Sequence, residues 1–255
     1  MSSEYYLSGR GDRAKRSGNK IREMESYNTA YVVADGDSKV RSTFIRETYI
    51  HLAMAVVAFA GIEYFLINFT NMGELMMGFL SKGAYMWLVV LGGFMGISFV
   101  SQRMAESSTS KGMQYAGLGL FVVGESIIFL PLLYMAAQFA PHAIGQAGVA
   151  TGGLFLALTV IAFTTRKDFS FLGGMLKLGF IVALALIAGS IFFGFDLGTW
   201  FSGAMILLAG GSILYNTSNI IHHYHPSQSV VAALGLFASL ATLFWYILQL
   251  LMSRD

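Results

Sequence analysis

The chain has 255 residues, of which 55% are hydrophobic and only 12% are charged. Charged residues usually make up about a quarter of a soluble domain, so the composition excludes an ordinary soluble protein and indicates a helical protein that crosses a membrane several times. The absence of cysteine excludes disulfides, thiolate metal sites and cysteine nucleophiles. The net charge of +2 predicts no nucleic-acid partner, because most of the basic residues precede residue 50, beside a predicted membrane face.

Residues 1–41 are polar, carry charges of both signs, and show no apolar periodicity. They contain no apolar core of a signal peptide. We therefore expect a mostly disordered cytoplasmic tail over residues 1–41, followed by a membrane domain over residues 42–255.

The membrane domain contains seven apolar stretches, each near the roughly 20 residues that a helix needs to span hydrocarbon. The predicted fold class is an all-α membrane protein with seven transmembrane helices joined by short linkers. The stretches cover residues 50–69, 84–101, 115–139, 144–164, 171–194, 199–221 and 229–252.

Lysine and arginine predict the orientation, because they gather on the cytoplasmic side of membrane proteins. Nine lie before residue 50, and two lie in each of the linkers after the second and fourth stretches. Only Lys82 and Arg254 lie on the opposite side, and Lys177 lies near the cytoplasmic end of the fifth stretch. The N-terminus is predicted to be cytoplasmic and the C-terminus outside.

Polar residues within the stretches are the candidate functional residues, because an unsatisfied polar group in hydrocarbon costs several kcal/mol. The sixth stretch becomes polar at Tyr215 and Asn216, so we expect it to face the bundle interior. Glu125 lies inside the third stretch and is either a cation ligand or proton carrier, or a structural hydrogen-bond partner of Ser126 or of the sixth helix. Pro131, six residues later, predicts a kink.

The remaining ionisable residues favour structural roles. Asp168 precedes the fifth stretch and is expected to cap that helix. Glu63 either pairs with a polar group inside the bundle or, as we expect, reaches the outer membrane interface. His222, His223 and His225 form either a transition-metal or pH-sensing site or, as we expect, part of a solvated loop. No phosphate loop, zinc-protease motif or nucleophile elbow is found, so the chain is predicted not to be an enzyme and to need no cofactor.

Five segments carry a resemblance to a known family. The segment that contains Asp168 has the most specific pattern, Thr-Thr-Arg-Lys-Asp-Phe-Ser-Phe-Leu-Gly-Gly. Together the segments resemble the Bax inhibitor-1 family, in its bacterial YccA- and YetJ-like branch, over about residues 42 to 252. They are residues 44–52, 124–133, 164–174 (with Arg166), 213–217 and 233–244.

The resemblance implies six helices around a central seventh helix, and a pore that two hydrogen-bonded aspartates close. It also implies a pH-dependent calcium leak. This chain departs from the pattern: Asn216 replaces the aspartate of the sixth helix, Ser239 aligns with that of the seventh, and Thr242 with a nearby asparagine. Asn and Ser can hydrogen-bond to each other, but neither titrates near neutral pH.

The resemblance therefore implies an inner-membrane cation leak pore, with Ca²⁺ as the permeant ion, or a relative whose gate does not titrate. Its alternative is a regulator of membrane-protein quality control, which contacts a membrane protease such as FtsH through the N-terminal tail. The pore or gate candidates are Asn216, Ser239, Glu125, Tyr215 and Thr242, and the structural candidates are Asp168, Arg166 and Pro131.

Overall fold

The computed structural model describes residues 32–107, 110–165 and 167–253, and helices make up nearly all of this part of the chain. Within it, seven helices are long and apolar enough to cross a membrane, which confirms the predicted fold class. The elements in chain order are η1 (Val33–Asp35), α2 (Ser38–Phe69), α3 (Met72–Leu80), α4 (Tyr85–Ala105), α5 (Lys111–Phe139), α6 (Pro141–Thr165), α7 (Leu172–Phe193), α8 (Gly198–His222) and α9 (Ser229–Met252).

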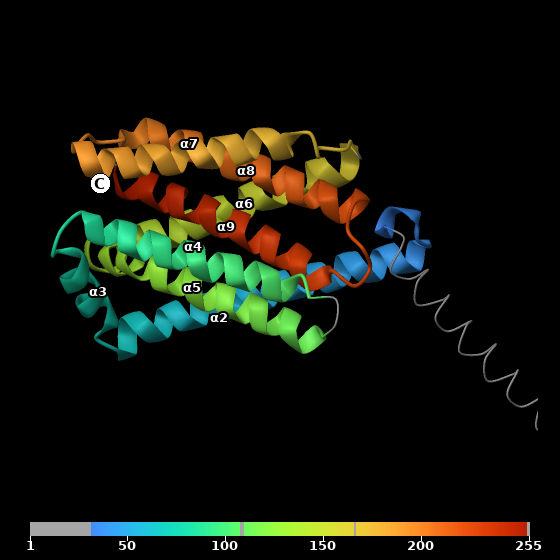
Figure 1. Ribbon diagram of the computed structural model, residues 1–255, viewed down its shortest axis with the longest axis horizontal. Helices are drawn as coiled ribbons and strands as arrows, with labels where there is room; N and C mark the ends of the chain where they lie inside the picture. Colours follow the sequence, from blue (N-terminus) through green and yellow to red (C-terminus); the bar gives the residue numbers. More distant parts are fainter. Residues whose placement is uncertain (1–31, 108–109, 166, 254–255) are drawn as a thin grey trace, which may run out of the picture.

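The long helices run side by side and alternate in direction (Figure 1). Short connections of this kind make sequence neighbours antiparallel neighbours. One end of the bundle, here called the N-terminal end, holds the start of α2 and the α4–α5, α6–α7 and α8–α9 turns. The other, the C-terminal end, holds α3, the α5–α6 and α7–α8 turns and the end of α9. The N-terminal end is the one predicted to be cytoplasmic.

Helix α9 lies in the interior of the bundle. It contacts α2, α4, α5, α6 and α8, and its Leu236, Leu243 and Leu248 side chains are fully buried. In the described part of the chain, the backbone of α7 does not approach α9; α7 packs against α8 and touches α4 instead. A ring of six helices around the seventh is therefore not confirmed, although five helices do contact α9.

The first long helix begins earlier than its apolar stretch. Helix α2 starts at Ser38, so the boundary drawn at residue 41 falls inside it. An α-helix can continue past hydrocarbon into the polar interface, and the hydrophobic pattern alone does not mark its start. Before α2, Val33 is fully buried, and its N–H donates to the Tyr224 carbonyl at 2.8 Å. The described end of the predicted tail is thus attached to the α8–α9 turn; residues 1–31 of that tail lie outside the described residues.

Close packing of α4 on α5 depends on Gly117. A Cβ atom at this position would lie 2.6 Å from both the Ser101 carbonyl oxygen and the Ala105 nitrogen of α4. Gly119, one half-turn away, has open space around it. Small residues allow helix backbones to approach closely in membranes, and here one glycine performs that role.

Helix α5 continues through Pro131. The proline is fully buried, and the helix extends unbroken from Lys111 to Phe139. Transmembrane helices tolerate an internal proline where neighbouring helices cover the site. The kink expected there stays a prediction.

Candidate functional site

A hydrogen-bonded pair joins the last two helices. The Asn216 side-chain N–H of α8 donates to the Ser239 hydroxyl of α9 at 2.8 Å and to the Gly235 carbonyl at 3.1 Å. The Ser239 hydroxyl in turn donates to the same Gly235 carbonyl at 3.0 Å. Asn216 and Ser239, which the sequence resemblance had suggested as a pair, are therefore in direct contact. The pair holds α8 to α9 without a group that titrates near neutral pH.

Gly235 gives the asparagine room. A Cβ atom there would lie 3.2 Å from the Asn216 Oδ1 atom, closer than ordinary contact. The pair is flanked by fully buried apolar side chains, Ile213 on α8 and Leu236 on α9.

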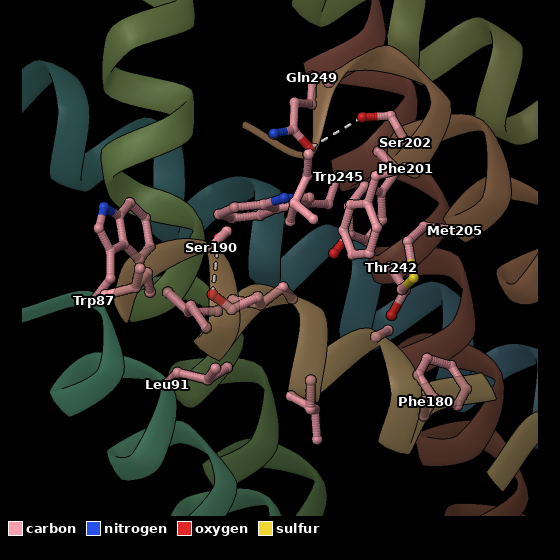
Figure 2. Close-up of a pocket in the computed structure, with 18 of the residues that line it drawn as sticks. Trp87, Leu91, Phe180, Ser190, Phe201, Ser202, Met205, Thr242, Trp245 and Gln249 are labelled. Atoms are coloured by element: carbon pink, nitrogen blue, oxygen red, sulfur yellow. Dashed lines mark hydrogen bonds between the residues drawn. The ribbon is translucent and has the colours of Figure 1, made fainter. Parts of the chain in front are cut away.

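A cavity of about 720 Å³ opens towards the C-terminal end of the bundle (Figure 2). Its walls are mainly aromatic and aliphatic, with several hydroxyl and amide groups, and α4, α5, α7, α8 and α9 all contribute to it. Figure 2 shows residues from several of these helices around one space; those labelled are Trp87, Leu91, Phe180, Ser190, Phe201, Ser202, Met205, Thr242, Trp245 and Gln249.

Glu125 also lines this cavity. It lies 14 residues from each end of α5, about 21 Å along the helix from either Lys111 or Phe139. Its side chain is only 5% exposed, and no described residue hydrogen-bonds to its carboxyl group. The expected alternative, a bond to Ser126, is not found, because the Ser126 hydroxyl donates to the Val122 carbonyl of its own helix. The carboxyl group is available to a proton or a cation in the cavity.

Thr242 faces the same cavity but takes no part in the Asn216–Ser239 pair. Its hydroxyl donates to the Ala238 carbonyl, one turn back on α9, at 2.8 Å. The threonine oxygen can still accept a hydrogen bond from an occupant of the cavity.

A second, smaller hollow of about 370 Å³ lies at the N-terminal end, and Tyr215 and Asn219 of α8 contribute to its wall. Along α8, Met205 is the last residue that lines the cavity, and Tyr215 is the first that lines the hollow. These two residues are ten positions apart, or about 15 Å. Asn216 follows the hollow-lining Tyr215 by one position on α8, and Ser239 precedes the cavity-lining Thr242 by three positions on α9, so the pair joins the two helices close to both spaces but lines neither.

The sequence had suggested that Asp168 caps α7, but its side chain accepts no hydrogen bond from the first residues of that helix. One carboxylate oxygen accepts the Ser170 backbone N–H at 2.8 Å in the turn before the helix. The other lies 3.1 Å from the His223 Nε2 atom of the α8–α9 turn. Chiefly the Ser170 N–H, and also the Ser170 and His223 side chains, lower the pKa of Asp168 to about 2. The carboxylate thus connects two turns at the N-terminal end; its neighbour Arg166 lies outside the described residues.

The predicted solvated loop of three histidines is therefore only partly solvated. His223 is half-exposed but paired with Asp168, and the His222 ring lies 3.0 Å from the Ser218 carbonyl. Among the described residues, no group of three or more His, Asp or Glu side chains is placed to hold a metal ion. Sequence reasoning missed the Asp168–His223 contact, because the two residues are 55 positions apart and lie in separate turns.

The interface placement of Glu63 is wrong. This side chain is 4% exposed, and in the described part of the chain neither carboxyl oxygen has a hydrogen-bond partner. Helix α2 packs against α3 as well as α5 and α9, and the apolar pattern of the sequence did not indicate α3. A buried carboxyl group at this depth is expensive unless it is protonated or paired.

Comparison with known proteins places this arrangement in a family. The family model described as "Inhibitor of apoptosis-promoting Bax1" matches residues 41–255. The chain is 33% identical over 173 residues to "Modulator of FtsH protease YccA" of Escherichia coli, covering 66% of this chain and 76% of the relative. It is 29% identical over 236 residues to "Bax inhibitor 1" of Schizosaccharomyces pombe, covering 89% and 83%. It is also 25% identical over 228 residues to the "Golgi anti-apoptotic protein" of vaccinia virus, covering 89% and 92%.

Proposed function

This chain belongs to the Bax inhibitor family of integral membrane proteins, and we propose that it is a cation leak pore which the Asn216–Ser239 hydrogen bond holds closed. The single observation that carries this proposal is the position of that bond. It joins α8 to α9 one position from Tyr215, which lines the N-terminal hollow, and one turn from Thr242, which lines the cavity. A small displacement of α8 relative to α9 breaks the bond and joins the spaces.

The charge in the cavity supports a cation as the permeant species. Glu125 and Asp196 line it, whereas Lys, Arg and His are absent from its described lining. Ca²⁺ prefers several oxygen ligands, so one mid-membrane carboxylate with a threonine oxygen and water would hold the ion weakly. Weak binding is what passage requires, because a tightly held ion does not leave.

The closing pair makes this leak differ from a carboxylate-gated one. Two adjacent carboxylates share a proton and respond to pH, whereas an amide and a hydroxyl do not. We therefore expect little pH dependence from the pair itself in the native chain.

The test is calcium flux into proteoliposomes between pH 6 and pH 8, with protein-free vesicles as the baseline. The native protein is expected to leak above that baseline at each pH, and the Asn216→Asp, Ser239→Asp double variant to leak in a pH-dependent way. Glu125→Gln is expected to reduce the flux of both. Native protein that never exceeds empty vesicles would refute the leak, whatever the double variant does.

A second candidate, regulation of a membrane protease, rests on the Escherichia coli relative, whose name describes it as a modulator of FtsH protease. The contact would be the polar N-terminal tail, as in the sequence-based hypothesis. A deletion that tests it should end at residue 31, because Val33 is buried against the α8–α9 turn. If removal of residues 2–31 leaves co-purification with the protease and the turnover of its substrates unchanged, this role of the tail fails.

A further inference from the structure

The cavity that Glu125 lines has the size and walls of an organic-ligand site. Its volume of about 720 Å³ lies within the range of about 300 to 1,000 Å³ that is typical of small-molecule pockets. Trp245 is central to its wall: the rings of Trp245 and Phe129 meet edge to face with centroids 4.9 Å apart, and Trp87 lies 6.5 Å from Trp245. These aromatic faces suit a hydrophobic body more than a hydrated metal ion.

The carboxyl group in the cavity favours a positive occupant whenever it is ionised. Glu125 is 5% exposed, lies midway along its helix, and receives no hydrogen bond from any described residue. A carboxylate in that position is costly unless the occupant supplies a positive charge and hydrogen-bond donors. Neither an anion nor a neutral lipid chain supplies them. An ammonium group supplies both, and it is also attracted to the faces of tryptophan rings.

The position of the cavity indicates how such an occupant enters. Helices α4 and α7 form two of its walls. The only buried residues of α4 are Ser101 and Ala105, at its far end, and α7 has none after Ala183. The cavity is therefore bordered by helix segments whose outer faces would meet lipid. A molecule that partitions into the bilayer would therefore gather next to the walls of the cavity.

We propose that this cavity binds an amphipathic organic ammonium ion, with the N–H donors on the Glu125 carboxylate and the hydrophobic body against Trp245, Phe129 and Trp87. The Thr242 oxygen is a second acceptor for the ammonium group. Binding of this kind does not require that any ion crosses the membrane, so it goes beyond the proposed leak.

The chain offers a direct optical test, because it has three tryptophans and two of them line the cavity. The third, Trp200, is 90% exposed and would meet detergent. In a Trp200→Phe background, the emission reports on Trp87 and Trp245 alone. The probe is 12-bromododecylamine, whose bromine quenches tryptophan emission on contact, and the neutral reference is 12-bromododecanol. The protein with only Trp200, made by Trp87→Phe and Trp245→Phe, measures partition into the micelle.

We expect saturable quenching by the amine in the Trp200→Phe protein, with little saturable quenching by the alcohol. Glu125→Gln is expected to raise the Kd of the amine at least tenfold. Glu74→Gln, the same change at an exposed position outside the cavity, is expected to leave the Kd unchanged. Ser190→Phe, which narrows the cavity but leaves the carboxylate in place, is expected to weaken binding as well and provides a second test if Glu125→Gln does not fold.

Equal quenching by the alcohol would overturn the proposal, since the cavity would then accept any apolar chain. An unchanged Kd in Glu125→Gln would overturn it too. Because the measurement uses detergent-solubilised protein and no gradient, a negative result here leaves the flux experiment unaffected, and a silent flux experiment does not refute binding.

Discussion

Removal of the Asn216 side chain tests the closing pair quantitatively. Asn216→Ala deletes two hydrogen bonds to α9, those to the Ser239 hydroxyl and the Gly235 carbonyl. Hydrogen bonds between membrane helices contribute about 0.6 kcal/mol each on average. The closed state should therefore lose about 1.2 kcal/mol, which corresponds to a rise of about eightfold in the open-to-closed ratio and in the initial leak rate.

Ser239→Ala provides the second arm of a double-mutant cycle. Of the hydrogen bonds between α8 and α9 it removes only the one between the two side chains, the other lost bond being within α9, so the leak should rise by about threefold, from about 0.6 kcal/mol. The two variants share that bond, and the double variant should therefore leak about as much as Asn216→Ala alone rather than the product of the two effects.

The assay is the initial rate of calcium entry into proteoliposomes with equal protein content. Ser126→Ala is a matched control, because its buried hydroxyl donates to a carbonyl of its own helix and joins no two helices. Leak rates that are unchanged in both single variants would refute the closing role of the pair. Effects that multiply in the double variant would show that the two residues act separately.

Three further predictions concern packing, charge and topology. Gly117→Ala should reduce the free energy of unfolding by about 1–3 kcal/mol, because its methyl group meets the backbone of α4, and the melting temperature of the detergent-solubilised protein should fall accordingly. Gly119→Ala should leave the melting temperature unchanged. Because the pKa of Asp168 is lowered to about 2, its carboxylate stabilises the fold above about pH 4, and that contribution disappears as the pH falls towards 2. The drop in melting temperature between pH 4 and pH 2 should therefore be smaller in Asp168→Asn than in the native protein. An equal drop in the two proteins would contradict the pairing. The chain has no cysteine, so Glu106→Cys and Ser81→Cys report on the N-terminal and C-terminal ends of the bundle, respectively. In sealed inverted vesicles, an impermeant maleimide should label the Glu106→Cys protein and not the Ser81→Cys protein.

The apolar pattern of the chain was enough to predict the seven spans. Hydrocarbon of fixed thickness demands about 20 apolar residues per crossing, and no soluble fold explains stretches of that length and composition. The same physics pointed to Asn216 and Glu125, because a polar group in a span must find a partner or a polar space. What the sequence could not provide was the identity of the partner: Ser239 followed only from a family resemblance, and the hydrogen bond itself depends on how α8 and α9 pack.

Contacts between segments that are distant in the chain could not be predicted from local sequence. The Asp168–His223 pair joins the α6–α7 turn to the α8–α9 turn, and the Val33–Tyr224 hydrogen bond attaches the end of the tail to that same α8–α9 turn. Glu63 was misplaced for the same reason, because helix periodicity marks where a side chain lies along its own axis, whereas burial depends on which neighbours cover that face. Local sequence therefore predicted the helices. Packing between the helices formed the cavity, placed Glu125 in its wall, and brought Asn216 of α8 to Ser239 of α9.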